Sequence, residues 1–330
     1  MLNIIPVCFS TDNNYFPYMA AAIHSVMENA SKQQLYRIFI LYADTDIYEE
    51  YKLKLENHIK VYDNFAIEYI DVTDYIKGYS FNTSNTTLLP NVTYYRLLIP
   101  YIFGRYEKVI YLDCDIICLE DIAKILNDNP MDAVLEASRD LGMLDKKNKE
   151  GKEYIEQLGL KNHTDYFNAG VLVFNIAAFA KAITQDELFS KANLSHLRYS
   201  DQCILNIVCE GKVRFLNMAW NLMSDKDMKF AHPYDNEYKI ARKYPYIIHY
   251  IYKPWKHIYI SKRHQYFWQH ATKTPFFDTK YSEMDYGELH ESIYNDIRKG
   301  KRFGPRFLIK CSILWIITKI KKCFKFGRFT

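Results

Sequence analysis

The 330-residue sequence contains neither a CxxC pair nor an even number of cysteines, and it lacks both the glycine-rich dinucleotide turn and the phosphate-binding P-loop. The seven cysteines, at positions 8, 114, 118, 203, 209, 311 and 323, predict free thiols in a reducing compartment rather than a disulfide framework. Without a glycine-rich loop, a bound nucleotide has to be held by side chains and a metal ion. The N-terminus has no basic segment, and residues 3–9 have the pattern of a core strand, so no signal peptide is expected.

The sequence also lacks an apolar run long enough to cross a bilayer, which takes roughly 20 residues. Residues 307–320 are apolar but interrupted by Lys310 and flanked by basic residues. Ten of the 43 Lys and Arg residues follow residue 298, whereas all 39 Asp and Glu residues precede it, so a body of net charge −6 carries a basic tail. We expect residues 303–330 to lie as an interfacial helix on an anionic membrane surface; the alternative is a core-packing helix with a basic exposed face. The acidic body argues against nucleic acid as a partner.

Strand and helix patterns alternate along the first seventy residues. Apolar strand patterns at 3–9, 36–42 and 65–71 are separated by helical patterns at 16–29 and 47–57. This alternation predicts an α/β fold with a doubly wound, mostly parallel sheet flanked by helices. Further strands are predicted at 132–137, 166–175 and 246–250, helices at 93–101, at 121–126 and from residue 200, and a mobile loop at 78–91. We expect one domain over residues 1–275 and a basic helical extension over 276–330.

Residues 109–119 (VIYLDCDIICL) are an almost unbroken run of β-formers, which predicts one buried parallel strand. Because residues i and i+2 of a strand share a face, Asp113 and Asp115 are expected to point at one spot beyond the sheet. Open α/β sheets bind ligands there. Two carboxylates suit Mg²⁺ or Mn²⁺ with positions left open for the phosphates of a nucleotide. The alternative is an ordinary solvated turn.

Polar residues also stand at the ends of other predicted elements. Asp12 follows the first strand, where it either holds a base or ribose or acts as a turn and N-cap residue. Arg96 on the helix predicted at 93–101 either faces a ligand or pairs with a surface acid. Asn168 and Gly170 open the strand at 166–175; the amide can read hydroxyl groups, and the glycine allows a close backbone approach.

Two further segments add candidate ligands. Ser200 is predicted to cap a helix, with Asp201 and Gln202 projecting from its first turn; the alternative for Asp201 is a complement to the helix dipole. His249 ends the strand predicted at 246–250, and Lys253 follows four residues later. A histidine beside two carboxylates makes a metal shell, and a nearby lysine can meet a diphosphate.

Taken in order, these segments resemble family 8 of the glycosyltransferases, in particular the bacterial enzymes that add galactose or glucose during lipopolysaccharide or lipooligosaccharide core synthesis. The matching motifs are residues 9–15 (FSTDNNY), 93–96 (TYYR), 109–115 (VIYLDCD), 167–170 (FNAG), 201–206 (DQCILN) and His249 with 253–255 (KPW). The resemblance implies a GT-A fold and a retaining transfer of galactose or glucose from a UDP-sugar to a saccharide or glycolipid acceptor. It also implies a cytoplasmic protein, peripheral on the inner face of the cell membrane.

The resemblance further implies roles for single residues. Mn²⁺, or Mg²⁺, is expected on Asp113, Asp115 and His249. Catalysis is assigned to Gln202, Asp201 and Asp140, with Gln202 on the face of the anomeric carbon opposite the leaving group. Contacts to the UDP-sugar are expected from Ser10, Asp12, Asn14, Thr93, Arg96, Asp113, Cys114, Asn168, Ala169 and Lys253, of which Asp12 and Asn14 hold the uridine and Lys253 the phosphates.

Two positions depart from the family's pattern. Cys203 stands where the family has the second Asp of an Asp-Gln-Asp motif, and the short segment between His249 and Lys253 lacks the usual glycine. These departures leave open a catalytically silent UDP-sugar or glycan-binding protein, and an enzyme that glucosylates itself is a further alternative. A haloacid-dehalogenase-like phosphatase is disfavoured, because Ile116 and Ile117 replace its Gly and Thr and no GDxxxD motif follows.

Overall fold

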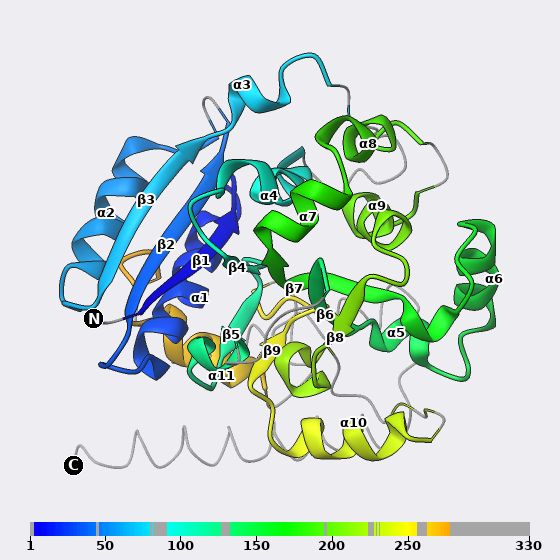
Figure 1. Ribbon diagram of the computed structural model, residues 1–330. Coiled ribbons are helices and arrows are strands. Elements are labelled where there is room, and N and C mark those ends of the chain that lie inside the picture. The colour runs from blue at the N-terminus through cyan, green and yellow to red at the C-terminus, as the bar shows by residue number, and fades with distance from the viewer. Residues whose placement is uncertain are drawn as a thin grey trace, which may run out of the picture.

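A seven-stranded sheet runs through the protein, with its strands in the order β3-β2-β1-β4-β7-β6-β8 (Figure 1). In this computed structural model the described residues are 3–43, 46–79, 81, 91–126, 133–194, 197–223, 228, 230, 232–255 and 263–277. The strands of the main sheet are β1 (Ile4–Ser10), β2 (Leu35–Tyr42), β3 (Phe65–Asp71), β4 (Lys108–Leu112), β6 (Leu135–Arg139), β7 (Phe167–Asn175) and β8 (Val213–Phe215). A second, two-stranded sheet pairs β5 (Ile116–Cys118) with β9 (Ile247–His249).

Helices connect these strands and cover the main sheet. The α-helices are α1 (Phe16–Asn29), α2 (Glu49–Ile59), α3 (Thr73–Ile76), α4 (Ile99–Ile102), α5 (Leu141–Leu144), α6 (Lys149–Gln157), α7 (Ile176–Ala182), α8 (Gln185–Ser190), α9 (Ser200–Val208), α10 (Tyr234–Lys243) and α11 (His264–Ala271). Short 3₁₀ helices are η1 (Asn91–Leu98), η2 (Ile122–Leu126), η3 (His163–Asp165) and η4 (Met218–Asn221). The predicted helix at 16–29 and strand at 65–71 have the bounds observed for α1 and β3.

Strand directions divide the main sheet into two parts. β1 is parallel to β2 and β4, and β2 is parallel to β3. β7 runs antiparallel to both β4 and β6, and β8 is parallel to β6. The prediction of a mostly parallel α/β sheet is confirmed, but the simple doubly wound pattern is broken at β7, because an apolar run does not encode strand direction. The reversal brings the start of β7 to the edge where β1 and β4 end.

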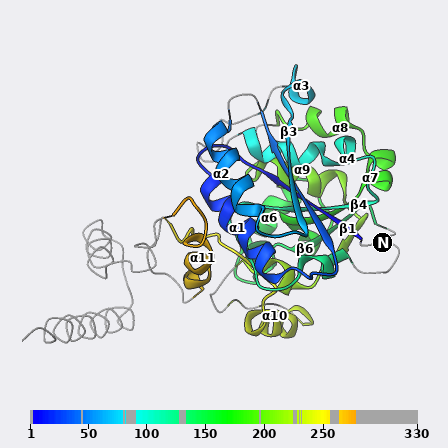
Figure 2. The ribbon, with the colours of Figure 1, turned by 90° about the vertical axis from the view of Figure 1, so that its left-hand side faces the viewer.

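The main sheet separates two hydrophobic layers, which follow from the period-2 pattern of its strands. Val7 and Phe9 of β1 face one core, shared with α1 and α2, whereas Cys8 faces the other, shared with η1, α7 and α9. Figure 2 shows α1, α2 and α11 on one side of the strands and α4, α7, α8 and α9 on the other. The sheet is therefore buried on both faces, as its near-continuous apolar strands require.

The prediction of a single strand over residues 109–119 is wrong. β4 ends at Leu112, a turn carries Asp113 and Asp115, and β5 then leaves the main sheet to pair antiparallel with β9. In that pairing Ile116 lies opposite His249. The two acids thus come close through a turn between two sheets and not by sharing a strand face, and the β5–β9 pairing brings the histidine to them.

Two helix predictions also need correction. The helix expected at 93–101 is η1 followed by α4, because Pro100, near the start of α4, has no N–H to continue an α-helical ladder from the preceding turn. Ser200 is not an N-cap: Tyr199 holds that position without a side-chain cap bond, and Ser200 is the first helical residue with φ of 39°. A side chain other than glycine is strained at that φ, and such strain is common at functional sites.

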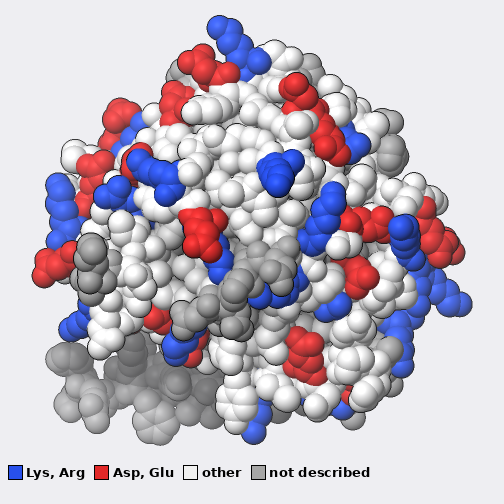
Figure 3. Space-filling view, viewed as in Figure 1, with Lys and Arg blue, Asp and Glu red and all other residues white. Residues whose placement is uncertain are grey.

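Several predictions concern residues that the structure describes only in part or not at all. The basic tail at 303–330 lies outside the described residues, as does most of the loop at 78–91, and the division into domains remains a prediction. The five described cysteines, at 8, 114, 118, 203 and 209, are buried and free. None of the helices in the described ranges has the length and hydropathy needed to cross a membrane. On the face drawn in Figure 3, acidic and basic side chains are interspersed between broad uncharged areas.

Candidate active site

A cleft of ≈ 390 Å³ opens at the edge of the sheet where β1 and β4 end and β7 begins. Parallel strands place their carboxyl ends at one edge, and the reversed β7 adds its first residues there. The lining residues are Ser10, Asp12, Tyr15, Val92, Thr93, Arg96, Tyr111, Asp113, Cys114, Asp115, Asn168, Ala169, Tyr199, Asp201, Gln202, His249, Ile251 and Lys253. The cleft therefore collects nearly all of the residues that the sequence analysis selected.

Asp113, Asp115 and His249 form a cluster of possible metal ligands in this cleft. Nε2 of His249 lies 3.2 Å from Oδ1 of Asp115 and 3.7 Å from Oδ2 of Asp113. One ligand atom from each residue lies within 4.8 Å of the others. Asp115 and His249 are buried, and Asp113 is partly exposed to the cleft. Two carboxylates and an imidazole are a fitting donor set for Mn²⁺.

The ring of His249 is oriented by Asn221 of η4, which the sequence analysis did not select. Nδ1 of His249 lies 2.9 Å from Oδ1 of Asn221. Because an amide oxygen only accepts, Nδ1 carries the proton, and the lone pair of Nε2 faces the two carboxylates. Asn221 in turn donates from Nδ2 to Oδ1 of Asn168 at 2.9 Å. Asn221 thus fixes the tautomer of His249 that can bind a metal through Nε2.

Gly170 makes room for this cluster, as predicted from its place at the start of a strand. A Cβ atom at position 170 would lie 2.8 Å from Nδ1 of His249 and 2.8 Å from Oδ2 of Asp113. The glycine backbone also holds the neighbouring turn, because its carbonyl oxygen accepts a hydrogen bond from the N–H of Asp113 at 2.8 Å. The strand β7 therefore forms a wall against which the two ligands lie.

Arg96 is buried and joins two acids of the cleft, so its pairing with a surface acid is excluded. Its Nη2 lies 2.9 Å from Oδ1 of Asp113, and its Nε lies 3.0 Å from Oδ2 of Asp201. Burial by itself would raise the pKa of Asp113, but Arg96 and His249 outweigh it and hold the pKa below the usual value. Burial raises the pKa of Asp201 to about 6, and Arg96 opposes that rise. Arg96 thus keeps two neighbouring carboxylates in place.

Asp140, Asn168 and Gln202 are joined by hydrogen bonds at the edge of the cleft. Nδ2 of Asn168 donates to Oδ2 of Asp140 at 3.2 Å and to Oε1 of Gln202 at 3.1 Å. Gln202 Oε1 also accepts from the N–H of Ala169 at 3.0 Å, and its Nε2 donates to Oδ2 of Asp140 at 3.3 Å. The amide of Gln202 is therefore held in one orientation. Asp140 does not line the cleft but supports the two amides that do, and it also caps α5.

The remaining predicted residues divide into those at the cleft wall and one beyond it. Ser10, Asp12, Thr93, Cys114, Ala169 and Lys253 all line the cleft. The Lys253 ammonium pairs with Asp115. Asp12 also accepts a hydrogen bond from the N–H of Tyr15 at 2.9 Å, so it combines the turn role with a place in the cleft. Asn14 is exposed and does not line the cleft; its amide donates to Asp12 at 3.3 Å.

Cys203, which departs from the family's motif, lies behind the cleft. It is buried, and its sulfur lies 3.1 Å from the hydroxyl of Tyr154 and 3.2 Å from that of Tyr166. Sequence reasoning missed several aromatic and apolar lining residues, among them Tyr111, Tyr199 and Ile251. Tyr111 packs under the guanidinium of Arg96, 4.5 Å from ring centre to Cζ. The spacing of two residues between Tyr111 and Asp113 was the signal in the sequence that could have indicated this lining residue.

Comparison with known proteins identifies the family of this chain. The profile of Glycosyl transferase family 8 matches residues 6–259. A candidate glycosyltransferase of Haemophilus influenzae is 30% identical over 234 residues, which are 69% of this chain and 65% of that protein. The lipopolysaccharide 1,2-glucosyltransferase of Escherichia coli K12 is 26% identical over 265 residues, 76% of this chain and 72% of that protein.

Solved structures share the fold. The bifunctional glycosyltransferase WbbM has a TM-score of 0.69 at 26% identity, covering 83% of this chain and 50% of its own. The galactosyltransferase LgtC, crystallised with donor and acceptor sugar analogues, has a TM-score of 0.64 at 23% identity, covering 82% of this chain and 96% of its own. The chain thus spans less than two thirds of the Haemophilus protein and half of WbbM. With the profile matched over most of its length, the chain belongs to glycosyltransferase family 8 and has the GT-A fold.

Proposed function

We propose that this sugar-transferring enzyme moves a hexose from a UDP-sugar to a saccharide acceptor with retention of anomeric configuration, and that it needs Mn²⁺ or Mg²⁺. The observation that carries the proposal is the cluster of Asp113, Asp115 and His249 on the cleft floor, with Nε2 of the histidine facing both carboxylates. These residues would hold the metal, which when bound supplies positive charge next to the diphosphate of the donor.

Different residues of the cleft are proposed to stabilise the negative and the positive charge that develop during the reaction. As the bond between the sugar and the diphosphate breaks, negative charge grows on the leaving phosphate, and Lys253 lies beside the metal ligands to stabilise it. Positive charge grows on the sugar, and the oxygens of Asp201 and Gln202 line the same cleft. Arg96 and Asn168 are proposed to position the sugar hydroxyls, and Asp12 the uridine.

Retention of configuration is proposed to occur by attack on the face of the sugar that the leaving group occupies. The acceptor oxygen forms its bond to the anomeric carbon as the bond to the phosphate breaks, and the leaving phosphate oxygen takes the acceptor's proton. A covalent intermediate on Gln202 is disfavoured because its amide oxygen is a poor nucleophile and already accepts two hydrogen bonds. Trapping of a sugar adduct on Gln202 or Asp201 contradicts the same-face route.

The identity of the sugar and the acceptor rests on the relatives. The Escherichia coli protein is named a lipopolysaccharide 1,2-glucosyltransferase, and one from Salmonella typhimurium a lipopolysaccharide 1,3-galactosyltransferase. We therefore propose glucose or galactose as the sugar and a lipopolysaccharide, a lipooligosaccharide or another surface glycan as the acceptor. We also propose that the reaction takes place in the cytoplasm, at the inner face of the cell membrane.

Membrane docking is proposed for the basic tail at 303–330 on sequence grounds. Changing Lys321, Lys322 and Lys325 to Gln in the full chain removes about 1 kcal/mol of attraction for each lysine near an anionic surface. Sedimentation with anionic vesicles should then fall at least about tenfold. The matched control changes three exposed body lysines (Lys54, Lys124 and Lys239), and equal loss in both variants contradicts the docking role.

The deciding experiment measures UDP release from a panel of UDP-sugars, with Mn²⁺ and with EDTA. Wild type is compared with Asp113→Ala and with the control Asp74→Ala, which changes an exposed acid on α3. Metal-dependent release from one donor, lost in Asp113→Ala and kept in the control, supports the proposal and identifies the sugar. UDP binding without release from any donor, even with oligosaccharide acceptors present, refutes it in favour of a catalytically silent binding protein.

A further inference from the structure

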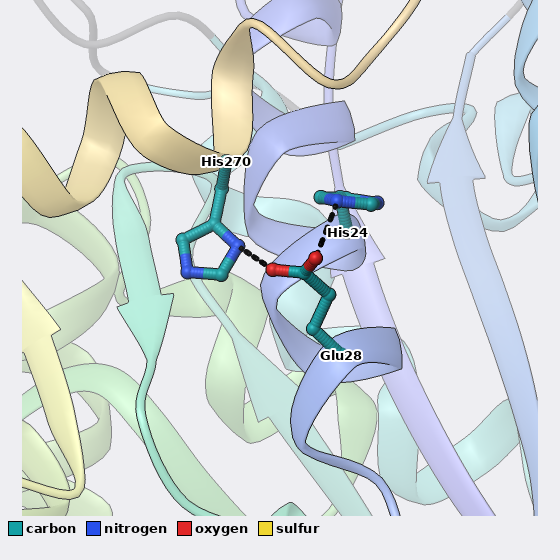
Figure 4. Close-up of side chains that lie close together, drawn as sticks. All are labelled: His24, Glu28 and His270. Carbon is teal, nitrogen blue, oxygen red and sulfur yellow. Dashed lines mark ion pairs between the residues drawn. The ribbon is translucent and has the colours of Figure 1, made fainter.

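A second cluster of metal-binding side chains lies between α1 and α11 (Figure 4). His24 and Glu28 are one helical turn apart on α1, and His270 reaches them from α11. Oε2 of Glu28 lies 3.0 Å from Nδ1 of His270, and its Oε1 lies 3.5 Å from Nε2 of His24. The cleft adjoins the other end of α1 at Tyr15, which is about 13 to 20 Å away along the helix axis. The cluster is therefore separate from the proposed catalytic site.

Two buried nitrogen atoms in this cluster receive no well-aligned hydrogen bond from the part of the chain that the structure describes. Nε2 of His24 and Nδ1 of His270 have no hydrogen-bond partner of suitable geometry among the described residues. The residues are only 4% and 7% exposed. Both nitrogens face the carboxylate of Glu28 (Figure 4). Because buried polar atoms in proteins are almost always satisfied, two such atoms converging on one carboxylate indicate a missing ligand.

A hydrogen bond to His58 sets the orientation of the His24 ring. Nδ1 of His24 lies 3.0 Å from Nε2 of His58. A proton on Nδ1 of His24, donated to His58, leaves the lone pair of its Nε2 facing Glu28. A lone pair and a carboxylate that face each other in a buried place favour a cation between them.

We propose that His24, Glu28 and His270 bind a Zn²⁺ ion that fastens α11 to α1. Two imidazole nitrogens and one carboxylate oxygen are a zinc ligand set, with the fourth position left to water. Ligands of tetrahedral zinc lie about 3.4 Å apart, given bond lengths of about 2.1 Å. The three ligand atoms here lie within 4.8 Å of one another, so small side-chain movements complete the site. A solvent-accessible hollow of ≈ 560 Å³ bordered by Glu28 and His270 provides the path of entry.

The position of the zinc site gives it a structural role. Phe267 of α11 packs on Trp255 with ring centres 5.0 Å apart, and Trp255 stacks on Tyr18 of α1 at 3.7 Å. The two helices that the zinc joins therefore enclose Trp255, which follows Lys253 of the cleft by two residues. Loss of the zinc is expected to loosen α11 and this segment without removing a group from the cleft.

Lys273 allows a change in zinc affinity to be predicted. Its ammonium pairs with Glu28, and its side chain is 51% exposed, so it can leave without disturbing the core. The ammonium and the zinc compete for the same carboxylate. Lys273→Met should therefore tighten zinc binding about tenfold, which corresponds to about 1.4 kcal/mol.

The experiment uses the full chain without an affinity tag, carrying Asp113→Asn and Asp115→Asn to disable the cleft cluster. Bound zinc is counted by plasma mass spectrometry after equilibrium dialysis, and affinity is measured by competition with a chromophoric chelator. We expect one zinc per chain, lost in His270→Gln and in Glu28→Gln. The control His163→Gln changes a histidine of η3 that belongs to neither cluster, and it should keep the zinc.

Three results overturn the proposal. The first is zinc retained by both His270→Gln and Glu28→Gln. The second is an unchanged zinc affinity in Lys273→Met, a variant expected to fold because the lysine is half exposed. The third is a thermal midpoint that zinc raises equally in His163→Gln and His270→Gln, since binding at the cluster stabilises only chains that keep it.

Discussion

Replacing Gly170 with Ala tests the cleft geometry most directly. The substitution adds one methyl group to the wall of β7, 2.8 Å from Nδ1 of His249 and 2.8 Å from Oδ2 of Asp113. Ordinary contacts of a Cβ atom begin near 3.4 Å, so Oδ2 of Asp113 has to move by about 0.6 Å. The ring of His249 has to move further, because its Cε1 is the atom nearest to the added methyl group. The φ angle of Gly170 is not left-handed, and alanine therefore meets no backbone strain there.

The expected cost follows from how tightly the two ligands are held. His249 cannot retreat freely, because Asn221 binds its Nδ1 at 2.9 Å and its backbone N–H bonds to Leu222 at 3.0 Å. Displacing the ring from its supporting amide should weaken metal binding about 10- to 100-fold, as loss of such support does in metal sites generally. The added methyl group should cost about 1 to 3 kcal/mol of stability.

The assay titrates Mn²⁺ into the protein in the presence of UDP and follows free Mn²⁺ by its electron paramagnetic resonance signal. Thermal unfolding of the same samples shows that the variant is folded. The matched control is Gly104→Ala, because a Cβ atom at position 104 meets nothing within 4 Å. If Gly170→Ala binds Mn²⁺ as tightly as wild type and Gly104→Ala, the cluster of Asp113, Asp115 and His249 is not the metal site.

Three further outcomes are expected. Arg96→Met leaves the buried Asp201 and the partly exposed Asp113 without their shared cation and should lower the free energy of unfolding by about 3 to 5 kcal/mol in urea denaturation; a loss below about 1 kcal/mol contradicts this. Asn221→Ala should weaken Mn²⁺ binding about tenfold by freeing the imidazole it holds, with unchanged binding as the contrary result. Burial lowers the pKa of His24 to about 4, below its unfolded value near 6.5, so its contribution of about 3 kcal/mol is present above pH 6.5 and lost as the pH falls toward 4. A His24→Gln variant should flatten this slope, and an unchanged slope assigns the acid lability elsewhere.

Much of the fold could be predicted because local patterns suffice for it. The bounds of α1 and β3 follow from their apolar periodicity, and the polar residues at strand ends were placed in the cleft because strand ends of an α/β sheet meet at one edge. The sequence allows two interpretations of Arg96, since it does not show whether a helical arginine is buried. The motif places Asn14 at the ligand; in the structure it is exposed and bonded to Asp12, and its contact with a uridine stays a prediction.

The unpredicted features all depend on segments distant in sequence. Nothing in the sequence around Asn221 distinguished it, because its role arises from η4 packing behind His249 and Asn168. The cluster of His24 and His270 escaped notice for the same reason, since it forms only where α11 docks on α1.

The sequence by itself determined the family, the α/β architecture and the set of acids, amides and basic residues that the cleft contains. These features could be predicted because they depend on local periodicity and on short motifs in a fixed order. Only the tertiary structure decided how they act together. It reversed β7, ended β4 at Leu112, and paired β5 with β9 so that His249 meets the two aspartates. Strand direction, ring orientation and the burial of a charge depend on packing between elements, and a local pattern of residues does not carry that information.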